Sequence, residues 1–141
     1  MTVNLNPYLN FRGTAAEAMT HYQSVFGGTL TLSRFGDFPM GTDASENDLI
    51  MHSQLVAPGG LVLMGADVPS AMEFNPAPGN VSCSVSGDDV DQLRGYWEGL
   101  SAGGTVTAPF DKAPWGDWFG MCVDRFGISW LVNGGGTADV G

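Results

Sequence analysis

The sequence predicts an α+β fold in which one domain is built from two βαβββ modules. Two helix-like segments are separated and flanked by strand-like segments. Each helix-like segment has an apolar face and ends at a pair of glycines, which we call its glycine exit. The helix-face residues Tyr22 and Trp97 lie 75 residues apart, and the exits Gly27 and Gly103 lie 76 apart. The 141 residues suffice for one domain with its own core. This spacing predicts modules over about residues 4–67 and 80–133, and a flexible tail over 134–141.

The first module is expected to open with a strand over Leu5–Phe11 and a helix over residues 14–27. Thr14 and Glu17 match the T-x-x-E capping box, in which both side chains bind backbone N–H groups of the first helical turn. Gly27-Gly28 can adopt the left-handed conformation that ends a helix. The apolar face follows the three- and four-residue spacing of one helix side and consists of Ala18, Met19, Tyr22, Val25 and Phe26.

Three further strands complete this module, over Thr29–Phe35, Leu49–Val56 and Leu61–Ala66. The last two are joined by Ala57-Pro58-Gly59-Gly60, which has the residue types of a hairpin turn. The polar segment Gly36–Asp48, between the first two of these strands, is a candidate lid or edge.

The second module repeats this order after a proline-containing connection over Asp67–Gly79. Asn80–Ser86 alternates as a strand whose core face would carry Val81, Cys83 and Val85. Asp88 or Asp89 can cap the helix that follows, and Gly103-Gly104 can end it. The apolar stripe of this helix is Val90, Leu93, Trp97 and Leu100, and the later strands are expected over Val106–Phe110, Trp118–Val123 and Ile128–Val132.

Charge and hydrophobicity exclude several classes of partner. The chain has 15 acidic and 5 basic residues, and its net charge of -10 would repel nucleic acids and anionic lipid surfaces. No apolar run reaches the roughly 18 residues of a membrane-spanning helix, and Met1–Asn4 lacks the basic start of a signal peptide. We therefore expect a cytoplasmic protein whose Cys83 and Cys122 are reduced core thiols, because no zinc-site spacing surrounds either.

Several motifs resemble the PhnB-like branch of the vicinal oxygen chelate superfamily, which includes glyoxalase I, bleomycin-resistance proteins and extradiol dioxygenases. They are Pro7-Tyr8-Leu9-Asn10-Phe11, Ala16-Glu17-Ala18 with Tyr22 and Phe26-Gly27-Gly28, Trp115-Gly116-Asp117-Trp118-Phe119-Gly120, and Asp124-Arg125-Phe126-Gly127-Ile128-Ser129-Trp130. The resemblance implies a glyoxalase/bleomycin-resistance-like cupped sheet, in which polar residues facing the cup bind a small organic molecule or a divalent metal. It also favours a homodimer, since unpaired edge strands invite partnering.

The metal positions that the resemblance implies are poorly filled in this chain. They fall near Pro7, at Asn80 and at Leu131, and only Asp67, at the end of the fourth strand, offers a carboxylate. A catalytic metal of this kind needs about three or four His, Glu or Gln ligands with open positions beside them. We therefore expect no tightly held metal or other cofactor, with a divalent metal as the alternative.

The predicted ligand-binding residues are His52, Gln54, Asp67, Trp115 and Trp118. His52 and Gln54 would share one strand face with Ile50 and present an imidazole and an amide on the cup wall. The alternative for His52 is an exposed polar residue, and His21 on the first helix is expected to be exposed.

Other side-chain groups admit a functional and a structural interpretation. An aromatic group could wall an apolar pocket or build the core or a subunit interface, and it comprises Trp115, Trp118, Phe119, Phe126 and Trp130. An acidic group could gather a hard cation or form a solvated loop, and it comprises Asp37, Asp43, Glu46 and Asp48. Arg34 and Arg125 could meet an anionic ligand, although a structural salt bridge is favoured for Arg125.

Three functions remain open from the sequence. The first is a protein that binds a small organic molecule without a tightly bound metal. The second is a metal-dependent lyase, isomerase or dioxygenase that uses His52, Asp67 and a further ligand, and the third is a non-catalytic structural or interaction module. No G-x-S-x-G elbow, P-loop or H-E-x-x-H motif is present. The glycine groups do not follow the strand–glycine–helix order of a dinucleotide or S-adenosylmethionine site, so the methyltransferase label sometimes given to PhnB-like sequences has no support here.

Overall fold

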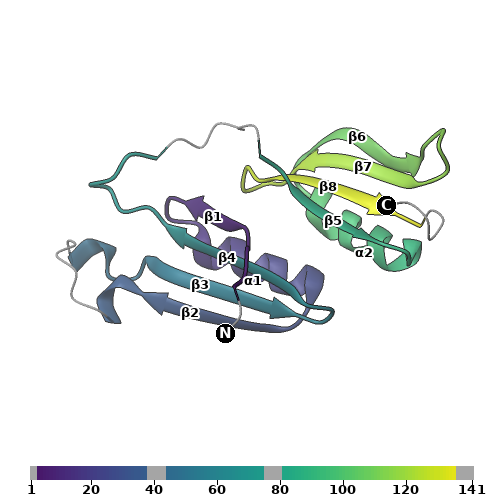
Figure 1. The fold of residues 1–141 in the computed structure, drawn as a ribbon. Coiled ribbons are helices and arrows are strands. Elements are labelled where there is room, and N and C mark those ends of the chain that lie inside the picture. Colours follow the sequence, from purple (N-terminus) through teal and green to yellow (C-terminus); the bar gives the residue numbers. More distant parts are fainter. Residues whose placement is uncertain (1–2, 38–43, 75–80, 136–141) are drawn as a thin grey trace. The chain divides into compact units, whose positions relative to one another are not determined.

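Two four-stranded β-sheets, each accompanied by one α-helix, make up the computed structural model of the chain, which describes residues 3–37, 44–74 and 81–135 (Figure 1). The contacts divide the chain into two compact units, Met1–Pro76 and Ala77–Gly141. Both units have the element order β-α-β-β-β, so the predicted pair of modules is confirmed. The cup that both modules would form together stays a prediction.

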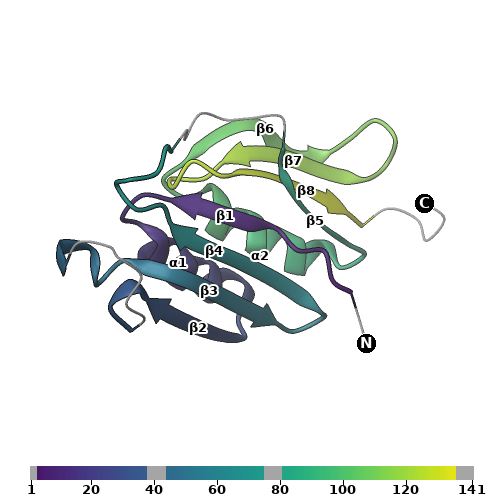
Figure 2. The same ribbon diagram turned by 60° about the vertical axis from the view of Figure 1, so that its left-hand side comes forward.

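The first unit has the strand order β1-β4-β3-β2, with β1 parallel to β4 and the other pairs antiparallel. Helix α1 lies against one face of this sheet (Figure 2). Two short 3-10 helices, η1 and η2, lie between β2 and β3. In chain order the elements are β1 (Tyr8–Phe11), α1 (Ala15–Phe26), β2 (Thr29–Arg34), η1 (Phe35–Asp37), η2 (Ala44–Glu46), β3 (Ile50–Ala57) and β4 (Leu61–Asp67).

The second unit repeats this topology with the strand order β5-β8-β7-β6, in which β5 is parallel to β8. Helix α2 packs against one face of that sheet. The elements are β5 (Cys83–Gly87), α2 (Val90–Ser101), β6 (Thr105–Lys112), β7 (Trp118–Val123) and β8 (Ser129–Gly134).

The apolar faces predicted for the two helices form the cores of their units. In α1, Ala18, Met19, Tyr22 and Phe26 are buried, and in α2, Leu93, Trp97 and Leu100 are buried. Burial of such side chains is the main favourable contribution to folding, at about 1.5–3 kcal/mol for each large one. The periodicity therefore identified most of the core correctly.

Four local predictions need correction or fall outside the described residues. The T-x-x-E capping box is wrong, because Thr14 at the N-cap of α1 makes no side-chain hydrogen bond. Val81 was expected in the core but precedes β5 and is 78% exposed. Strand β8 continues through Gly134, one residue into the predicted tail. Asn80 and residues 38–43, 75–79 and 136–141 lie outside the described residues.

Candidate functional site

The face of the first sheet opposite α1 carries a row of polar side chains. Ser53 and Leu55 of β3 are buried on the α1 side, as is Gly65 of β4, where an added Cβ would lie 3.4 Å from Met19 Sδ. Because side chains alternate along a strand, their neighbours point to the other face. We call this the helix-free face, and its members include Tyr8, Asn10, Thr31, Ser33, His52, Gln54, Val56, Val62 and Met64.

Tyr8 and His52 meet on the helix-free face, although they are 44 residues apart in sequence. Tyr8 Oη lies 3.1 Å from His52 Nδ1, and the two rings stack with centroids 5.7 Å apart and planes inclined by 26°. Tyr8 is 46% exposed, and His52 is half-buried. Partial burial raises the pKa of Tyr8 above its usual 10.0, so the phenol keeps its proton at neutral pH.

Gln54 lies beside this pair in a row that crosses the sheet. The strand register aligns Thr31 of β2, Gln54 of β3, Met64 of β4 and Tyr8 of β1. His52 follows two residues away from Gln54 on the same strand and the same face. The two residues predicted to share a strand face therefore do so, and the structure adds Tyr8.

Ile50 does not belong to that face, contrary to the sequence prediction. The β2–β3 register pairs Ser33 with His52 but Arg34 with Ile50. Between these two pairs β3 therefore advances by two residues while β2 advances by one. Such a β-bulge changes the phase of the side-chain alternation. Ile50 is consequently fully buried, with Ser53 and Leu55, while His52 points the other way.

Asp67 holds the backbone of the first unit together. Its Oδ1 accepts hydrogen bonds from the N–H groups of Gly13 and Ala15, at 2.7 and 3.0 Å, and its Oδ2 accepts one from Ile50 at 2.9 Å. The side chain is only 4% exposed. Asp67 thus supplies the cap of α1 that Thr14 does not, and this arrangement argues against the ligand role predicted for it.

The predicted aromatic residues of the second unit divide between the two faces of its sheet. Trp118 packs on the α2 side, where its ring centroid lies 5.7 Å from that of Phe110 and the Arg94 guanidinium lies 5.0 Å above it. Trp115, in the β6–β7 turn, is 67% exposed and meets Phe119 edge to face at 6.2 Å. Trp118 therefore lies among packing contacts, whereas Trp115 is accessible.

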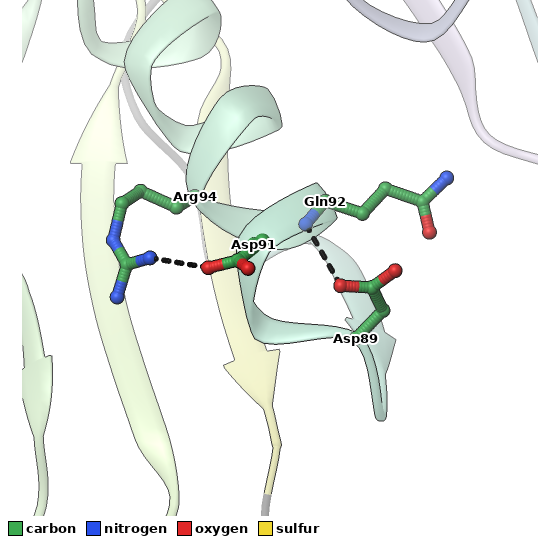
Figure 3. Close-up of polar contacts among 4 residues, drawn as sticks. All are labelled: Asp89, Asp91, Gln92 and Arg94. Carbon is green, nitrogen blue, oxygen red and sulfur yellow. Dashed lines mark hydrogen bonds and ion pairs between the residues drawn. The ribbon is translucent and has the colours of Figure 1, made fainter.

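Side chains at the N-terminus of α2 cap the helix and pair with one another, as Figure 3 shows. Asp89 accepts a hydrogen bond from the Gln92 N–H at 3.1 Å, which confirms one of the two predicted caps. Asp91 forms an ion pair of 2.9 Å with Arg94, the residue that covers Trp118. The exposed ion pair contributes little to stability by itself, and the same guanidinium lies over the Trp118 ring.

Asp124 organises the turn of the D-R-F-G-x-x-W motif. Its Oδ1 accepts from the N–H groups of Phe126 and Ile128, at 2.9 and 3.0 Å, and its Oδ2 accepts from Trp130 Nε1 at 2.8 Å. Trp130 is 3% exposed, so its indole N–H needs such a partner. The motif is therefore structural in this chain.

The remaining charged candidates also make local contacts. Arg125 forms no ion pair within the described part of the chain, and its guanidinium lies 4.9 Å above the Phe126 ring, so the favoured salt bridge is wrong. Asp37 accepts from the Arg34 N–H, and Glu46 accepts from the N–H and hydroxyl of Ser70. Of the other two members of the predicted acidic group, Asp48 is exposed and Asp43 lies outside the described residues.

Both cysteines are free thiols. Cys122 is buried, and burial together with the nearby Asp124 raises its pKa from 9.0 to about 11; the same causes raise the pKa of Cys83. A thiol that resists ionisation is a poor nucleophile and a poor metal ligand. Cys122 is therefore the core thiol that the sequence predicted, whereas Cys83 is a free thiol that is only half-buried.

Three of the metal positions implied by the family resemblance, Pro7, Asp67 and Leu131, lie within the described residues, and they do not fit a metal. Both oxygens of Asp67 are used by backbone donors, Leu131 has no donor atom, and the carbonyl of Pro7 accepts from the Met64 N–H. No group of three or more His, Cys, Asp or Glu side chains suited to a metal occurs in residues 3–37, 44–74 and 81–135.

No helix in this part of the chain has the length and apolarity needed to cross a membrane.

Tyr8 is the site residue that the sequence prediction missed. The signal was present in the first strand, where Leu9 and Phe11 are buried and Tyr8 alternates with them. Strict alternation would have placed Tyr8 on the face opposite the core. Its pairing with His52 could not be predicted, because it depends on β1 lying beside β4 and not beside β2.

Comparisons with known proteins agree with this architecture. Residues 3–133 match the family described as 3-demethylubiquinone-9 3-methyltransferase. The crystal structure of protein PA1353 from Pseudomonas aeruginosa is 35% identical, with a TM-score of 0.84 over 94% of this chain and 98% of that one.

Two less similar solved structures share the fold. One is a Bacillus cereus protein named as a 3-demethylubiquinone-9 3-methyltransferase and PhnB protein, at 23% identity and a TM-score of 0.71 over 94% of this chain and 99% of that one. The other is a glyoxylase/bleomycin resistance protein/dioxygenase domain from Frankia sp. EAN1pec, at 20% identity and a TM-score of 0.65 over 97% and 99%. The glyoxalase/bleomycin-resistance-like α+β fold class expected from the sequence is thereby confirmed.

Proposed function

This chain belongs to the family described as 3-demethylubiquinone-9 3-methyltransferase, a PhnB-like family with the glyoxalase/bleomycin-resistance fold, and we propose that it binds a small organic molecule on the helix-free face of its first sheet. The observation that carries the proposal is the Tyr8–His52 pair. A phenol and an imidazole stack and hydrogen-bond on a sheet face that α1 does not cover. Small-molecule sites combine apolar surface with a few placed polar groups, and Met64, which the strand register aligns with Tyr8, supplies apolar surface beside the pair.

Charge narrows the class of molecule that this face would take. The chain carries a net charge of -10, so its long-range field disfavours anions. Tyr8, His52 and Gln54 offer hydrogen-bonding groups and a stacking surface. A neutral or cationic organic molecule with an aromatic or other flat portion suits these groups best.

Methyl transfer is not part of this proposal. A bound dinucleotide or S-adenosylmethionine commonly uses free N–H groups at a helix N-terminus that follows a strand and glycines. In α1 the N–H groups of Gly13 and Ala15 are bonded to Asp67, and in α2 the N–H of Gln92 is bonded to Asp89. These donors are therefore engaged within the protein.

The rival proposal is a metal-dependent enzyme of the same superfamily that uses His52. The donor set disfavours it, because Asp67 is bonded to three backbone N–H groups and no group of three or more His, Cys, Asp or Glu side chains suited to a metal occurs in residues 3–37, 44–74 and 81–135. Elemental analysis of the purified protein, with a thermal-shift series over zinc, manganese, nickel, iron and magnesium, separates the two. A stoichiometric metal whose stabilising effect is lost in His52→Ala would favour the rival.

The direct test is a ligand screen with a matched pair of histidine variants. Neutral and cationic aromatic compounds are titrated into ¹⁵N-labelled protein, and hits are expected to shift the amides of residues on the helix-free face. His52→Ala should weaken the hits about two- to tenfold, the range for one lost hydrogen bond. His21→Ala, which changes the chain's other histidine on α1, should leave them unchanged. Hits that bind wild type and His52→Ala equally would refute the proposal.

We also propose a cytoplasmic homodimer that binds neither nucleic acid nor membranes. Strands β1, β2, β5 and β6 are the edges of their sheets in the order given above, and exposed edges can pair with a second copy. Gel filtration with light scattering at micromolar concentration should give twice the monomer mass of 14.8 kDa. A monomer mass would remove the dimer from the proposal.

A further inference from the structure

The hydrogen bond between Tyr8 and His52 can be formed in two ways that make opposite demands on a ligand. Tyr8 can donate its hydroxyl proton to an unprotonated His52 Nδ1, which leaves the proton of the neutral ring on Nε2. Alternatively, a protonated Nδ1 can donate to the Tyr8 oxygen, which leaves Nε2 with a lone pair. The first arrangement offers a ligand an N–H donor, and the second offers it an acceptor.

Acid–base chemistry favours the first arrangement. Imidazolium ions lose their proton at a pH of roughly 6.5, so the imidazole lone pair is a far stronger base than a phenol oxygen. Phenols, with a pKa of about 10, are in turn more acidic than the N–H of a neutral imidazole. A hydrogen bond between the two is strongest when the stronger acid donates to the stronger base. At 3.1 Å the contact lies at the long end of the range for a hydrogen bond.

No other side chain of the described residues competes for this hydrogen bond. In residues 3–37, 44–74 and 81–135, the Tyr8 hydroxyl and the His52 ring form no side-chain hydrogen bond except the one that they share. In either arrangement the shared bond satisfies one donor and one acceptor, and solvent must satisfy one donor and one acceptor. The relative acidity of the phenol and the imidazole therefore decides which group donates. The stacking of the rings further limits rotation of His52.

We propose that Tyr8 is a positioning residue that holds neutral His52 in the Nε2–H tautomer, so that the site selects molecules presenting a hydrogen-bond acceptor such as a carbonyl oxygen. This inference rests on the proposed function for the identity of the site. The His52 Nε2–H then serves as the donor, and Gln54, two residues along β3, supplies an amide that can donate or accept. With the negative net charge, the expected ligand is an uncharged or cationic carbonyl compound.

Nitrogen-15 NMR of the histidine rings tests the tautomer without any ligand. At about pH 8, where imidazoles are neutral, long-range ¹H–¹⁵N spectra should show His52 with a protonated Nε2 and an unprotonated Nδ1. A His21→Gln variant assigns the signals by removing the other ring. Tyr8→Phe, which keeps the stacking ring and removes the hydroxyl, should bring the two ¹⁵N shifts of His52 closer together as both tautomers become populated. A protonated Nδ1 in the wild type, or spectra unchanged by Tyr8→Phe, would overturn the inference.

Two probes of nearly the same shape test the ligand class. Acetophenone carries a carbonyl acceptor and ethylbenzene does not, so acetophenone should shift the His52 Nε2 signal on titration and ethylbenzene should not. Acetophenone should bind Tyr8→Phe about two- to tenfold more weakly than wild type, whereas ethylbenzene should bind both equally. Equal binding of the two probes to wild type would overturn the acceptor preference.

The outcomes separate this inference from the proposed function. Compounds that bind at the helix-free face, combined with an Nδ1–H tautomer, would overturn the inference and leave the binding site intact. An Nε2–H tautomer with no compound bound at this face would refute the proposed function and the ligand preference together, while the positioning role of Tyr8 would stand. Each result therefore decides at least one of the two statements.

Discussion

Removal of the Asp67 carboxylate should destabilise the first unit more than any other single hydrogen-bonding change discussed above. Three backbone N–H groups depend on it: those of Gly13 and Ala15 before and in the first turn of α1, and that of Ile50 at the start of β3. Asp67 is nearly fully buried, so solvent cannot readily replace it. In Asp67→Ala these donors lose their partners in a protein interior.

The magnitude follows from the number and type of bonds. A hydrogen bond to a charged group contributes roughly 1.5–3 kcal/mol. The lower end of that range for three bonds gives a loss of about 4 kcal/mol for Asp67→Ala, and the lower end applies because the Gly13 bond is only partly buried. Asp67→Asn keeps one oxygen for Gly13 and Ala15 but turns an NH₂ group toward the Ile50 N–H, so its loss should be about 2 kcal/mol. Asp89→Ala removes a single exposed cap of α2 and should cost about 1 kcal/mol.

The assay must report the two units separately. All four tryptophans, Trp97, Trp115, Trp118 and Trp130, belong to the second unit, so their fluorescence follows the unfolding of that unit. Urea unfolding is therefore measured by tryptophan fluorescence and by far-ultraviolet circular dichroism, which follows both units. Asp67→Ala should lower the midpoint of a circular dichroism transition, and Asp89→Ala should lower the fluorescence midpoint.

Hydrogen exchange locates the effect at single amides. The Gly13, Ala15 and Ile50 amides should exchange faster in Asp67→Ala, whereas the Gln92 amide, capped by Asp89, should lose protection only in Asp89→Ala. The reasoning would be refuted by a free energy of unfolding within about 1 kcal/mol of wild type, or by unchanged protection of the three amides. Either result would mean that Asp67 is not the cap of α1 in solution.

Two further predictions concern a close backbone contact and a thiol. Gly28→Ala should destabilise the protein about 2 kcal/mol more than Gly59→Ala in urea unfolding. Both glycines have positive φ, but an added Cβ at Gly28 would lie 2.1 Å from the Val56 carbonyl oxygen, whereas one at Gly59 would meet nothing within 4 Å. Equal losses of stability would show that the backbone at Gly28 can shift without cost. Burial raises the pKa of Cys122 from 9.0 to about 11, so the folded state holds the thiol proton more tightly than the unfolded state does. The stability that this protonated thiol contributes is complete below pH 9.0 and should be lost as the pH rises toward 11. Cys122→Ser should flatten the fall in urea midpoint over that pH range, and a slope unchanged by Cys122→Ser would contradict the raised pKa.

The order and type of elements could be predicted from the sequence because their signals are local. Spacing of three and four residues marked both helices to within two residues, and the Ala57–Gly60 turn joined β3 and β4 as expected. The internal repeat was visible because both modules share the same local sequence patterns: alternating strand residues, an apolar helix face and glycines at the end of the helix. Comparison with known proteins confirmed the family that these motifs suggested.

Errors arose where a distant residue replaced a local one. Thr14 and Glu17 have the spacing of a capping box, yet Asp67 supplies the cap from β4, 54 residues away from Gly13. Ile50 broke the alternation because Asp67 and the register shift at β2 hold it on the core side. No pattern within one segment could have indicated either outcome.

The amino-acid sequence by itself therefore determined the two βαβββ modules, the apolar helix faces, the acidic charge and the place of His52 and Gln54 on one strand face. Only the tertiary structure decided that Tyr8 joins His52, that both oxygens of Asp67 are engaged by backbone donors, and that Trp118 packs against α2 while Trp115 is exposed. The physical reason is the range of the interactions. Periodicity and turn chemistry act within a few residues, whereas the partners of a side chain are set by which strands lie side by side and in what register.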